Sequence, residues 1–289
     1  MLRERFHAMG TGMELVVDAP DGPLARAALA AARAEVARLE RLLSRFRPGS
    51  ELSRLNRERR MHVGADLMRV LVAALDLRRR TAGRFDPTLG RAMWAWGYDR
   101  TFERVADDPR PAPRAPAGGA VALDRRRGWV ALGPGAELDL GAIAKGDAAD
   151  RAAALLAQAG PCLVDAGGDL VVSGPRAAGP WPVAVEGPGG PTVLMLERGA
   201  VATSGVDRRR WRRGGREAHH AMAPGRGAPA DTDLVRASAV ASTGAEADAL
   251  ATALLVAGAD GARALADDWR VPAVLVAGDG GVALAGGLR

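Results

Sequence analysis

Hydrophobic residues recur at helical spacing in three segments of the first 80 residues. Leucine and valine between residues 24 and 43 share one face of a long amphipathic helix, and residues 66–80 repeat the pattern. Between these segments, Ser50 precedes the apolar pair Leu52 and Leu55, in a position that caps a helix. The pattern therefore predicts two long helices with a short helix between them.

Short apolar runs predict strands over much of the remaining chain. Residues 6–19 form one or two strands interrupted by Met9-Gly10-Thr11-Gly12, and residues 121–123 and 129–132 flank an arginine-rich turn as in a hairpin. A helix containing Lys145 is expected to end near Gly160. Short strands then dominate residues 162–240, and two helices and a final strand pair close the chain.

Helices around a largely β centre predict an α+β fold with mixed or antiparallel sheets flanked by helices. We expect a single domain over residues 1–289, with no internal repeat. Residues 103–119 are rich in proline, alanine and arginine and are predicted to form a flexible, exposed excursion.

The composition limits the classes of partner. Although the formal net charge is +6, the arginines are scattered and rarely interleave with aromatic residues, so no nucleic-acid surface is predicted. The single cysteine, Cys162, excludes an internal disulfide and a multi-cysteine zinc site. The N-terminus has no signal-peptide pattern, and apolar stretches such as residues 249–259 are too short to span a bilayer. A cytoplasmic location without a membrane segment is the simplest expectation.

Lys145 is the one lysine of the chain, because every other residue among the 40 lysines and arginines is arginine. It lies where a short strand pattern passes through Gly141 into an alanine-rich helix. The first turn of a helix disfavours a cation and offers free N–H groups to an anion. A compositional accident on a solvated surface is the plainer interpretation, but this position favours a phosphate held between the lysine and the backbone.

A metal site is indicated on a helix that follows a capping box, Thr243 to Glu246. Asp248 and Thr252 are four residues apart on one face of that helix, and its other positions are mostly apolar. A buried carboxylate needs a partner, and Mg²⁺ is a natural one, since it takes one or two protein oxygens together with substrate phosphates. An arginine or the backbone is the alternative partner.

Two further features are candidate parts of a site. His219 and His220 are adjacent on the return strand of a predicted hairpin, so only one of them faces a given site. Glycine-containing turns at residues 165–169 and 202–205 would let the backbone approach a ligand, or they are ordinary tight turns. Neither turn matches a dinucleotide-binding or phosphate-loop motif.

Taken in order, these segments resemble the FAD:protein FMN transferase family, the ApbE-type flavin transferases. The resemblance covers nearly the whole chain, and no single motif carries it. The matching segments are Met9-Gly10-Thr11, Ser44-Arg45-Phe46, residues 50–56, Gly83-Arg84-Phe85-Asp86-Pro87-Thr88, residues 138–150, residues 164–169, Ala202-Thr203-Ser204-Gly205 and residues 247–253.

The resemblance implies a flavin transferase-like fold and an Mg²⁺-dependent enzyme. Its substrate would be FAD, whose FMN half would pass to a Thr or Ser hydroxyl in a flavinylation motif of an acceptor protein, with release of AMP. By motif position, Asp248, Thr252 and the carbonyl of Ala142 would hold the metal, and His220 matches the histidine implicated in catalysis. The FAD contacts would be Met9, Phe46, Arg84, Phe85, Asp86, Asp139, Lys145 and Met222.

The chain departs from the family pattern in two respects. Where the family shows His-x-x-Asp-Pro-x-Thr-Gly, this chain has Ala223 in place of the acidic residue and Arg226 in place of the hydroxyl. Two other functions follow from that change: a non-catalytic FAD-binding protein, and an FAD pyrophosphatase giving FMN and AMP. The lipoprotein signal of many family members is also missing, which fits a cytoplasmic copy or a truncated start.

Overall fold

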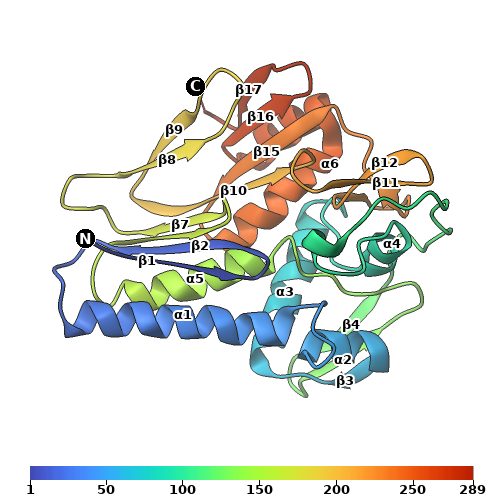
Figure 1. Ribbon diagram of the computed structural model, residues 1–289, viewed down its shortest axis with the longest axis horizontal. Helices are drawn as coiled ribbons and strands as arrows, with labels where there is room; N and C mark the ends of the chain where they lie inside the picture. The colour runs from blue at the N-terminus through green and yellow to red at the C-terminus, as the bar shows by residue number, and fades with distance from the viewer. Residues whose placement is uncertain (289) are drawn as a thin grey trace.

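The computed structural model describes residues 1–288 and centres on an eight-stranded antiparallel sheet (Figure 1). The strand order is β1-β2-β6-β7-β10-β15-β16-β17. In that order the strands span Leu2–Ala8, Thr11–Val17, Cys162–Ala166, Leu170–Ser173, Arg198–Gly205, Leu234–Ala241, Ala273–Ala277 and Val282–Ala285.

Three helices cover one face of this sheet: α1 (Pro23–Leu43), α5 (Ala144–Leu156) and α6 (Gly244–Trp269). Figure 1 shows α1 and α5 side by side beneath β1 and β2. The apolar face of α1 buries Leu29, Ala32 and Val36 against α5 and the strands, as its periodicity predicts. Each buried leucine or valine contributes about 1.5–3 kcal/mol to the stability of this layer.

A two-stranded hairpin, β8 (Trp181–Val185) and β9 (Thr192–Leu196), covers the opposite face of the sheet. Because successive side chains on a strand point to opposite faces, Val171 joins the helix-side core while Val172 joins the hairpin-side core. Trp181 and Val183 of β8 complete that second core. The central sheet is therefore buried between helices and a hairpin.

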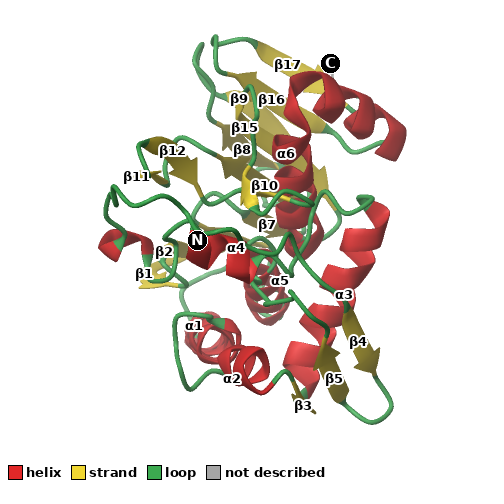
Figure 2. Cartoon of the chain, turned by 90° about the vertical axis from the view of Figure 1, so that its right-hand side faces the viewer, coloured by secondary structure: helices red, strands yellow, loops and turns green. Residues whose placement is uncertain are grey.

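A smaller unit lies beside this sandwich and surrounds α3 (Ala65–Arg80) (Figure 2). Ser50 caps α2 (Glu51–Glu58) by accepting a hydrogen bond from the amide N of Ser53 at 2.9 Å. A sheet of order β3-β5-β4 packs against the same core. The strands of this sheet are β3 (Arg60–His62), β4 (Val121–Asp124) and β5 (Trp129–Leu132). The remaining short elements of the chain are α4 (Gly90–Ala95), η1 (Phe102–Arg104), β11 (Arg210–Arg213), β12 (Arg216–His219), β13 (Met222–Ala223) and β14 (Ala228–Pro229).

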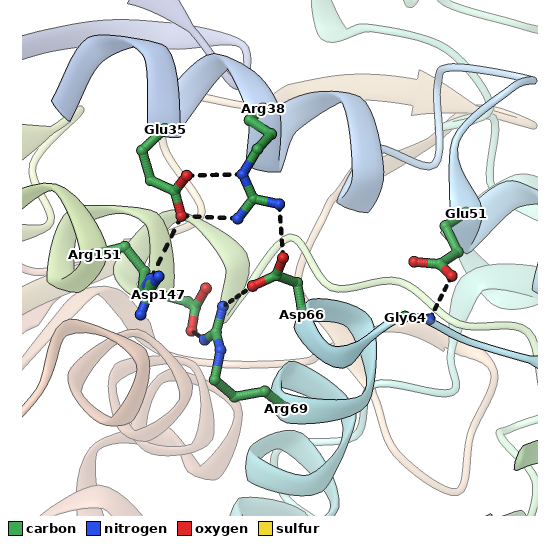
Figure 3. Close-up of polar contacts among 8 residues, drawn as sticks. All are labelled: Glu35, Arg38, Glu51, Gly64, Asp66, Arg69, Asp147 and Arg151. Atoms are coloured by element: carbon green, nitrogen blue, oxygen red, sulfur yellow. Dashed lines mark hydrogen bonds and ion pairs between the residues drawn. The ribbon is translucent and has the colours of Figure 1, made fainter. Parts of the chain in front are cut away.

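Arginine–carboxylate pairs join α1, α3 and α5 (Figure 3). Arg38 of α1 binds Glu35 on its own helix (Nε–Oε2 2.8 Å) and Asp66 at the start of α3 (Nη1–Oδ2 2.6 Å). Arg69 of α3 contacts Asp66 and also Asp147 in the first turn of α5. Partly exposed pairs of this kind stabilise by about 0–1 kcal/mol each, and together they fix the start of α5 against its neighbours.

The α+β prediction and most predicted elements are confirmed, including α1, α2, α3, and the β1–β2 and β4–β5 hairpins. One prediction is wrong in detail, since α5 ends at Leu156 rather than near Gly160, and the short α4 was not predicted. The two predicted C-terminal helices are confirmed as the two halves of α6, which meet at a kink where Gly258 has non-helical backbone angles (φ 72°, ψ 172°).

The length of α6 also corrects an expectation about membrane segments. With 26 residues and a mean hydropathy of 1.4, it is long and apolar enough to cross a bilayer by length and composition alone. However, α6 packs along β10 and β15 and carries the buried Asp248, paired with Lys145. A helix that is apolar on most sides and packed in this way is a core helix.

The segment that follows η1 forms no helix or named strand until β4. Asp108 attaches its middle to the β11–β12 hairpin, since its amide N donates to the carbonyl of Arg212 at 2.9 Å and its carboxylate contacts Arg213.

Candidate functional site

Helices α5 and α6 approach each other at a pair of glycines, and this contact builds the site. A Cβ atom on Gly146 would lie 2.6 Å from the amide N of Ala245 and closer still to the carbonyl of Gly244. Asp150 of α5 caps α6, since its carboxylate accepts hydrogen bonds from the amides of Gly244 (2.7 Å) and Ala245 (3.0 Å). The first turns of both helices are thereby held side by side.

This crossing brings Lys145 of α5 onto Asp248 of α6, with Nζ and Oδ2 3.0 Å apart. The same ammonium lies 2.9 Å from Oδ2 of Asp169, in the turn between β6 and β7, and donates to the carbonyl of Gly141 at 3.0 Å. We call Lys145, Asp169 and Asp248 the Lys145 cluster. Asp169 and Asp248 are 2% and 3% exposed, so the cluster places one ammonium and two carboxyl groups largely away from water.

Within the Lys145 cluster, the charge of each group affects the pKa of its neighbours. Burial alone would lower the pKa of the Lys145 ammonium, but Asp169 and Asp248 raise that pKa above its ordinary value. Burial raises the pKa of Asp248, and the charge of Asp169 raises it further, against the opposing effect of Lys145. Because a raised pKa favours the protonated carboxyl, a cation bound next to Asp248 would stabilise its ionised form.

The oxygen atoms around the cluster suit a hard divalent cation. Thr252, one turn along α6 from Asp248, shares a hydrogen bond with Ser204 of β10 (Oγ1–Oγ 2.8 Å). Ala142 lines the same cavity. Within residues 1–288 no group of three or more His, Cys, Asp or Glu side chains could hold a metal ion. The Asp248 carboxylate, the Thr252 hydroxyl and the backbone carbonyl of Ala142 are oxygen donors of the kind that Mg²⁺ takes, together with water or phosphate.

A cavity of about 930 Å³ opens onto the cluster. All twelve residues proposed from the sequence line it, although they come from segments spread over the whole chain. They are Met9, Phe46, Arg84, Phe85, Asp86, Asp139, Ala142, Lys145, His220, Met222, Asp248 and Thr252. Their contacts with FAD and metal stay predictions, but the structure brings every one of them to a single site.

One end of the cavity is aromatic and holds a buried guanidinium. The guanidinium of Arg45 contacts both the ring of Phe46 (4.1 Å from Cζ to the centroid) and the ring of Tyr98 (4.6 Å), whose centroids are 5.7 Å apart. It donates to the carbonyl of Tyr98 at 2.7 Å and is paired with Asp139. The other oxygen of Asp139 accepts from the amide of Gly141 at 2.7 Å. Asp139 is therefore held in one orientation at the cavity wall.

Asp86 lines the cavity, but its carboxylate is engaged by the protein. Its Oδ1 accepts hydrogen bonds from the amide and hydroxyl of Thr88 (2.9 and 2.6 Å), and Oδ2 pairs with Arg78 at 2.8 Å. Met9 lies in the left-handed region (φ 54°) at the β1–β2 turn. Asp86 holds the Thr88 backbone in place, and Met9 lies in a tight turn, and both residues form part of the cavity wall.

The two adjacent histidines face different surroundings, but only His219 lies on the predicted return strand, because β12 ends there and His220 lies just beyond it. His219 Nε2 lies 3.0 Å from the carbonyl of Ala230, whereas His220 lines the cavity and its Nδ1 has no hydrogen-bond partner within residues 1–288. Burial lowers the pKa of His220 to about 3, and Arg209, His219 and Lys145 contribute in the same direction. The imidazole is therefore neutral at pH 7.

The two departures from the family pattern lie beside the cavity, not in its wall. Ala223 is buried, Arg226 is exposed, and neither lines the cavity. The amide of Arg226 donates to the carbonyl of Ala223 at 3.2 Å, which closes a tight turn. Their replacement consequently leaves the Lys145 cluster and its surroundings intact.

Sequence reasoning did not single out several residues that complete the site. Asp169 was seen only as part of a glycine turn, and Ser204 only as part of another. No local signal marked Arg45 and Tyr98 as partners, because 53 positions separate them. Asp150 lies in a recognised motif, but its role as the cap of α6 depends on tertiary contact.

The sheet, its covering helices and this cavity define the class of flavin transferases. The structure is similar to the ApbE protein of Thermotoga maritima, with TM-score 0.87, 29% identity, and coverage of 98% of this chain and 96% of that chain. It is also similar to the apo form of the Pseudomonas stutzeri flavinyl transferase ApbE, with TM-score 0.85, 25% identity, and coverage of 98% and 94%.

The model of the ApbE family matches residues 9–275, and the chain belongs to this family. Two relatives are named FAD:protein FMN transferase. The one from Rhodobacter capsulatus is 34% identical, and the match covers 96% of this chain and 55% of the relative. The one from Haemophilus influenzae is 29% identical, with coverage of 81% and 73%. The chain thus spans about half the length of the R. capsulatus relative.

Proposed function

We propose that this protein transfers the FMN half of FAD to a Ser or Thr hydroxyl of an acceptor protein and releases AMP. The observation that carries the proposal is the Lys145 cluster, which places an ammonium, two carboxylates and nearby hydroxyls at the wall of a cavity of about 930 Å³. The name of the relatives, FAD:protein FMN transferase, supports the same reaction.

In the proposed reaction, the acceptor oxygen bonds to the FMN-side phosphorus. The bond from that phosphorus to the bridging oxygen breaks, and AMP leaves with its electron pair. Positioning and charge neutralisation carry such transfers. Mg²⁺, held by Asp248, Thr252 and the carbonyl of Ala142, would neutralise the pyrophosphate and the charge that develops on the leaving oxygen.

The side chains have separate tasks. Lys145 contributes a compact positive charge next to the phosphates, held in place by Asp169. His220 lines the cavity, and its Nδ1, which has no hydrogen-bond partner within residues 1–288, would accept the proton of the attacking hydroxyl. The Arg45–Asp139 pair and the Phe46 ring hold the dinucleotide at the aromatic end.

The test is incubation with FAD, Mg²⁺ and a peptide carrying an Asp-x-x-Ser/Thr-Gly-Ala-Ser/Thr motif. A fluorescent peptide after denaturation, with one AMP released per peptide modified, supports the transferase. Free FMN without labelled peptide indicates FAD hydrolysis, and the absence of AMP indicates a binding protein. Either of these two results contradicts the proposal.

Asp248→Asn tests the site itself. We expect Mg²⁺-dependent AMP release to fall roughly 10²–10³-fold, since that is the cost of removing one preorganised charge-stabilising group. Asp76→Asn is the matched control, because Asp76 is an exposed carboxylate paired with Arg79 on α3, outside the cavity. Wild-type AMP release by Asp248→Asn would disprove the assignment.

A further inference from the structure

β8 has a strand partner on one side only. It pairs with β9 from Trp181–Leu196 to Val185–Thr192, and no other strand within residues 1–288 pairs with it. Pro182 to Glu186 line the cavity, whereas no residue of β9 does. Figures 1 and 2 both show β8 on the side of the hairpin that faces β10. The free edge of β8, which we call the β8 edge, is therefore one wall of the cavity.

The β8 edge has backbone groups available for a partner. Apart from the ladder with β9, no backbone hydrogen bond within residues 1–288 involves Val183, Ala184 or Val185. In an antiparallel ladder, alternate residues direct their N–H and C=O groups to the partner strand, and the residues between direct them away. At least one of these three residues therefore directs both groups toward the cavity, where they offer a template for another extended chain.

The hairpin is a firm support for such a chain. Val183 and Val185 are 1% and 4% exposed and pack on the central sheet, so the position of the β8 edge is fixed by core contacts. Pro182 and Ala184 point the other way and are exposed. Across the ladder from them, Met195 and Val193 are 59% and 52% exposed. Pro182 and Ala184 would contact the side chains of a bound segment, whereas Met195 and Val193 lie one strand further from the free edge and do not line the cavity.

The residues that pack next to β8 lead to the Lys145 cluster. Leu170 and Val201 share a core with Val183 and Val185, and both line the cavity together with Thr203. Leu170 follows Asp169 in the chain, and the amide of Thr203 donates to Oδ1 of Asp169 at 3.3 Å. A chain lying along the β8 edge would therefore have side chains within the same cavity as the reacting groups.

The charges at the outer end of the β8 edge favour a neutral or acidic segment. Glu186 pairs with Arg208 (2.7 Å) and with Arg236 (2.8 Å), and Arg236 also pairs with Asp207. Arg209 lines the cavity and has no carboxylate partner within residues 1–288. These side chains therefore carry a net charge of about +1 at this end of the β8 edge, and this charge would repel a basic peptide.

We propose that the β8 edge binds the acceptor protein as an added strand. An extended segment of the acceptor forms main-chain hydrogen bonds with β8 and brings its hydroxyl residue to the Lys145 cluster. Strand addition recognises the backbone first and side chains at every second position, which suits an enzyme that modifies a protein segment. The inference rests on the proposed function, because it names how the partner of that reaction is held.

The test uses the full chain with Mg²⁺ and AMP and a dye-labelled decapeptide containing the Asp-x-x-Ser/Thr-Gly-Ala-Ser/Thr motif. Fluorescence anisotropy measures peptide binding without turnover. We expect Ala184→Arg to weaken peptide binding at least tenfold. Val193→Arg is the control, because Val193 is the ladder partner of Ala184 but does not line the cavity. Its peptide affinity should stay within twofold of wild type, and thermal melting should show both variants folded.

Two peptides methylated on alternate amide nitrogens test the backbone contact. Because strand pairing has a period of two residues, one methylated peptide should bind at least tenfold more weakly than the parent, and the other should bind within threefold of it. Equal affinities of the two peptides, unchanged binding by Ala184→Arg, or no binding of the parent peptide at millimolar concentration would overturn the proposal. Period-two binding without AMP release from FAD would instead leave the β8 edge established and refute the proposed transfer.

Discussion

Gly146→Ala tests the idea that the contact between α5 and α6 builds the site. Gly146 lies in the first turn of α5, directly after Lys145, and faces the start of α6. The added Cβ would meet the backbone of Gly244 and Ala245, which are not flexible side-chain ends that can move aside. An alanine in place of Gly244 would meet the same obstacle, since its Cβ would lie 2.6 Å from the carbonyl O of Gly146.

The size of the effect follows from the distances. The new Cβ lies 2.6 Å from the amide N of Ala245, whereas ordinary van der Waals contact begins near 3.4 Å. The helices must therefore separate by roughly 1 Å at this point, which moves the Asp248 carboxylate away from the Lys145 ammonium. Overpacking a close contact costs about 1–3 kcal/mol of stability. A displacement of about 1 Å in the reacting groups costs roughly 10²-fold in rate.

Urea unfolding followed by tryptophan fluorescence measures the first effect, and AMP release from FAD measures the second. Gly49→Ala is the control, because nothing lies within 4 Å of a Cβ at that position and Gly49 does not have a positive φ. It should stay within about 0.5 kcal/mol of wild type and retain full activity. Wild-type stability and rate in Gly146→Ala would refute the proposed role of the contact.

Three further predictions concern groups around the site. Burial raises the pKa of Asp150 to about 6, so its folded-state pKa exceeds the unfolded value of 3.8. The stability that this group contributes is present below pH 4 and is lost as the pH rises to 6. The free energy of unfolding of Asp150→Asn relative to wild type should therefore increase by about 1–3 kcal/mol between pH 4 and pH 7. A pH-independent difference would contradict the assignment. Arg78→Met should cost about 3–5 kcal/mol in urea unfolding because it leaves the buried Asp86 carboxylate without a cation, whereas Arg79→Met, which removes an exposed pair, should cost about 0–1 kcal/mol. Arg45→Lys should raise the Kd for FAD about tenfold in calorimetry, because an ammonium cannot stack on two rings while donating to both Asp139 and Tyr98. An unchanged Kd would show that Arg45 does not position Asp139.

The fold was predictable wherever local chemistry decides the structure. The apolar periodicity of α1 and α3, the Ser50 cap and the Thr243 cap all lie within a few residues of the elements they define. The end of α5 at Leu156 and the short α4 were not predicted. The division of the C-terminal helical segment was expected from the sequence, and the break lies at Gly258.

The site was predictable in its motifs but not in its contacts. Asp248 and Thr252 share a helix face by spacing alone, whereas Asp169 reaches Lys145 only because strands β6 and β7 place their connecting turn at the α5–α6 crossing. The sequence also suggested a phosphate as the anion beside Lys145. In the structure, the nearest anions to Lys145 are the carboxylates of Asp169 and Asp248. The lysine therefore links the proposed metal site on α6 to the turn between β6 and β7.

The isolation of Lys145 gives a direct way to follow opening of the molecule. A lysine-specific protease has a single cleavage position in this chain, at a side chain only 18% exposed and buried among carboxylates. Digestion at that peptide bond requires α5 to unwind, so two fragments accumulate only as fast as this region opens. Saturating nucleotide should slow the formation of these fragments, so the rate of cleavage after Lys145 would report how much of the protein has nucleotide in the cavity.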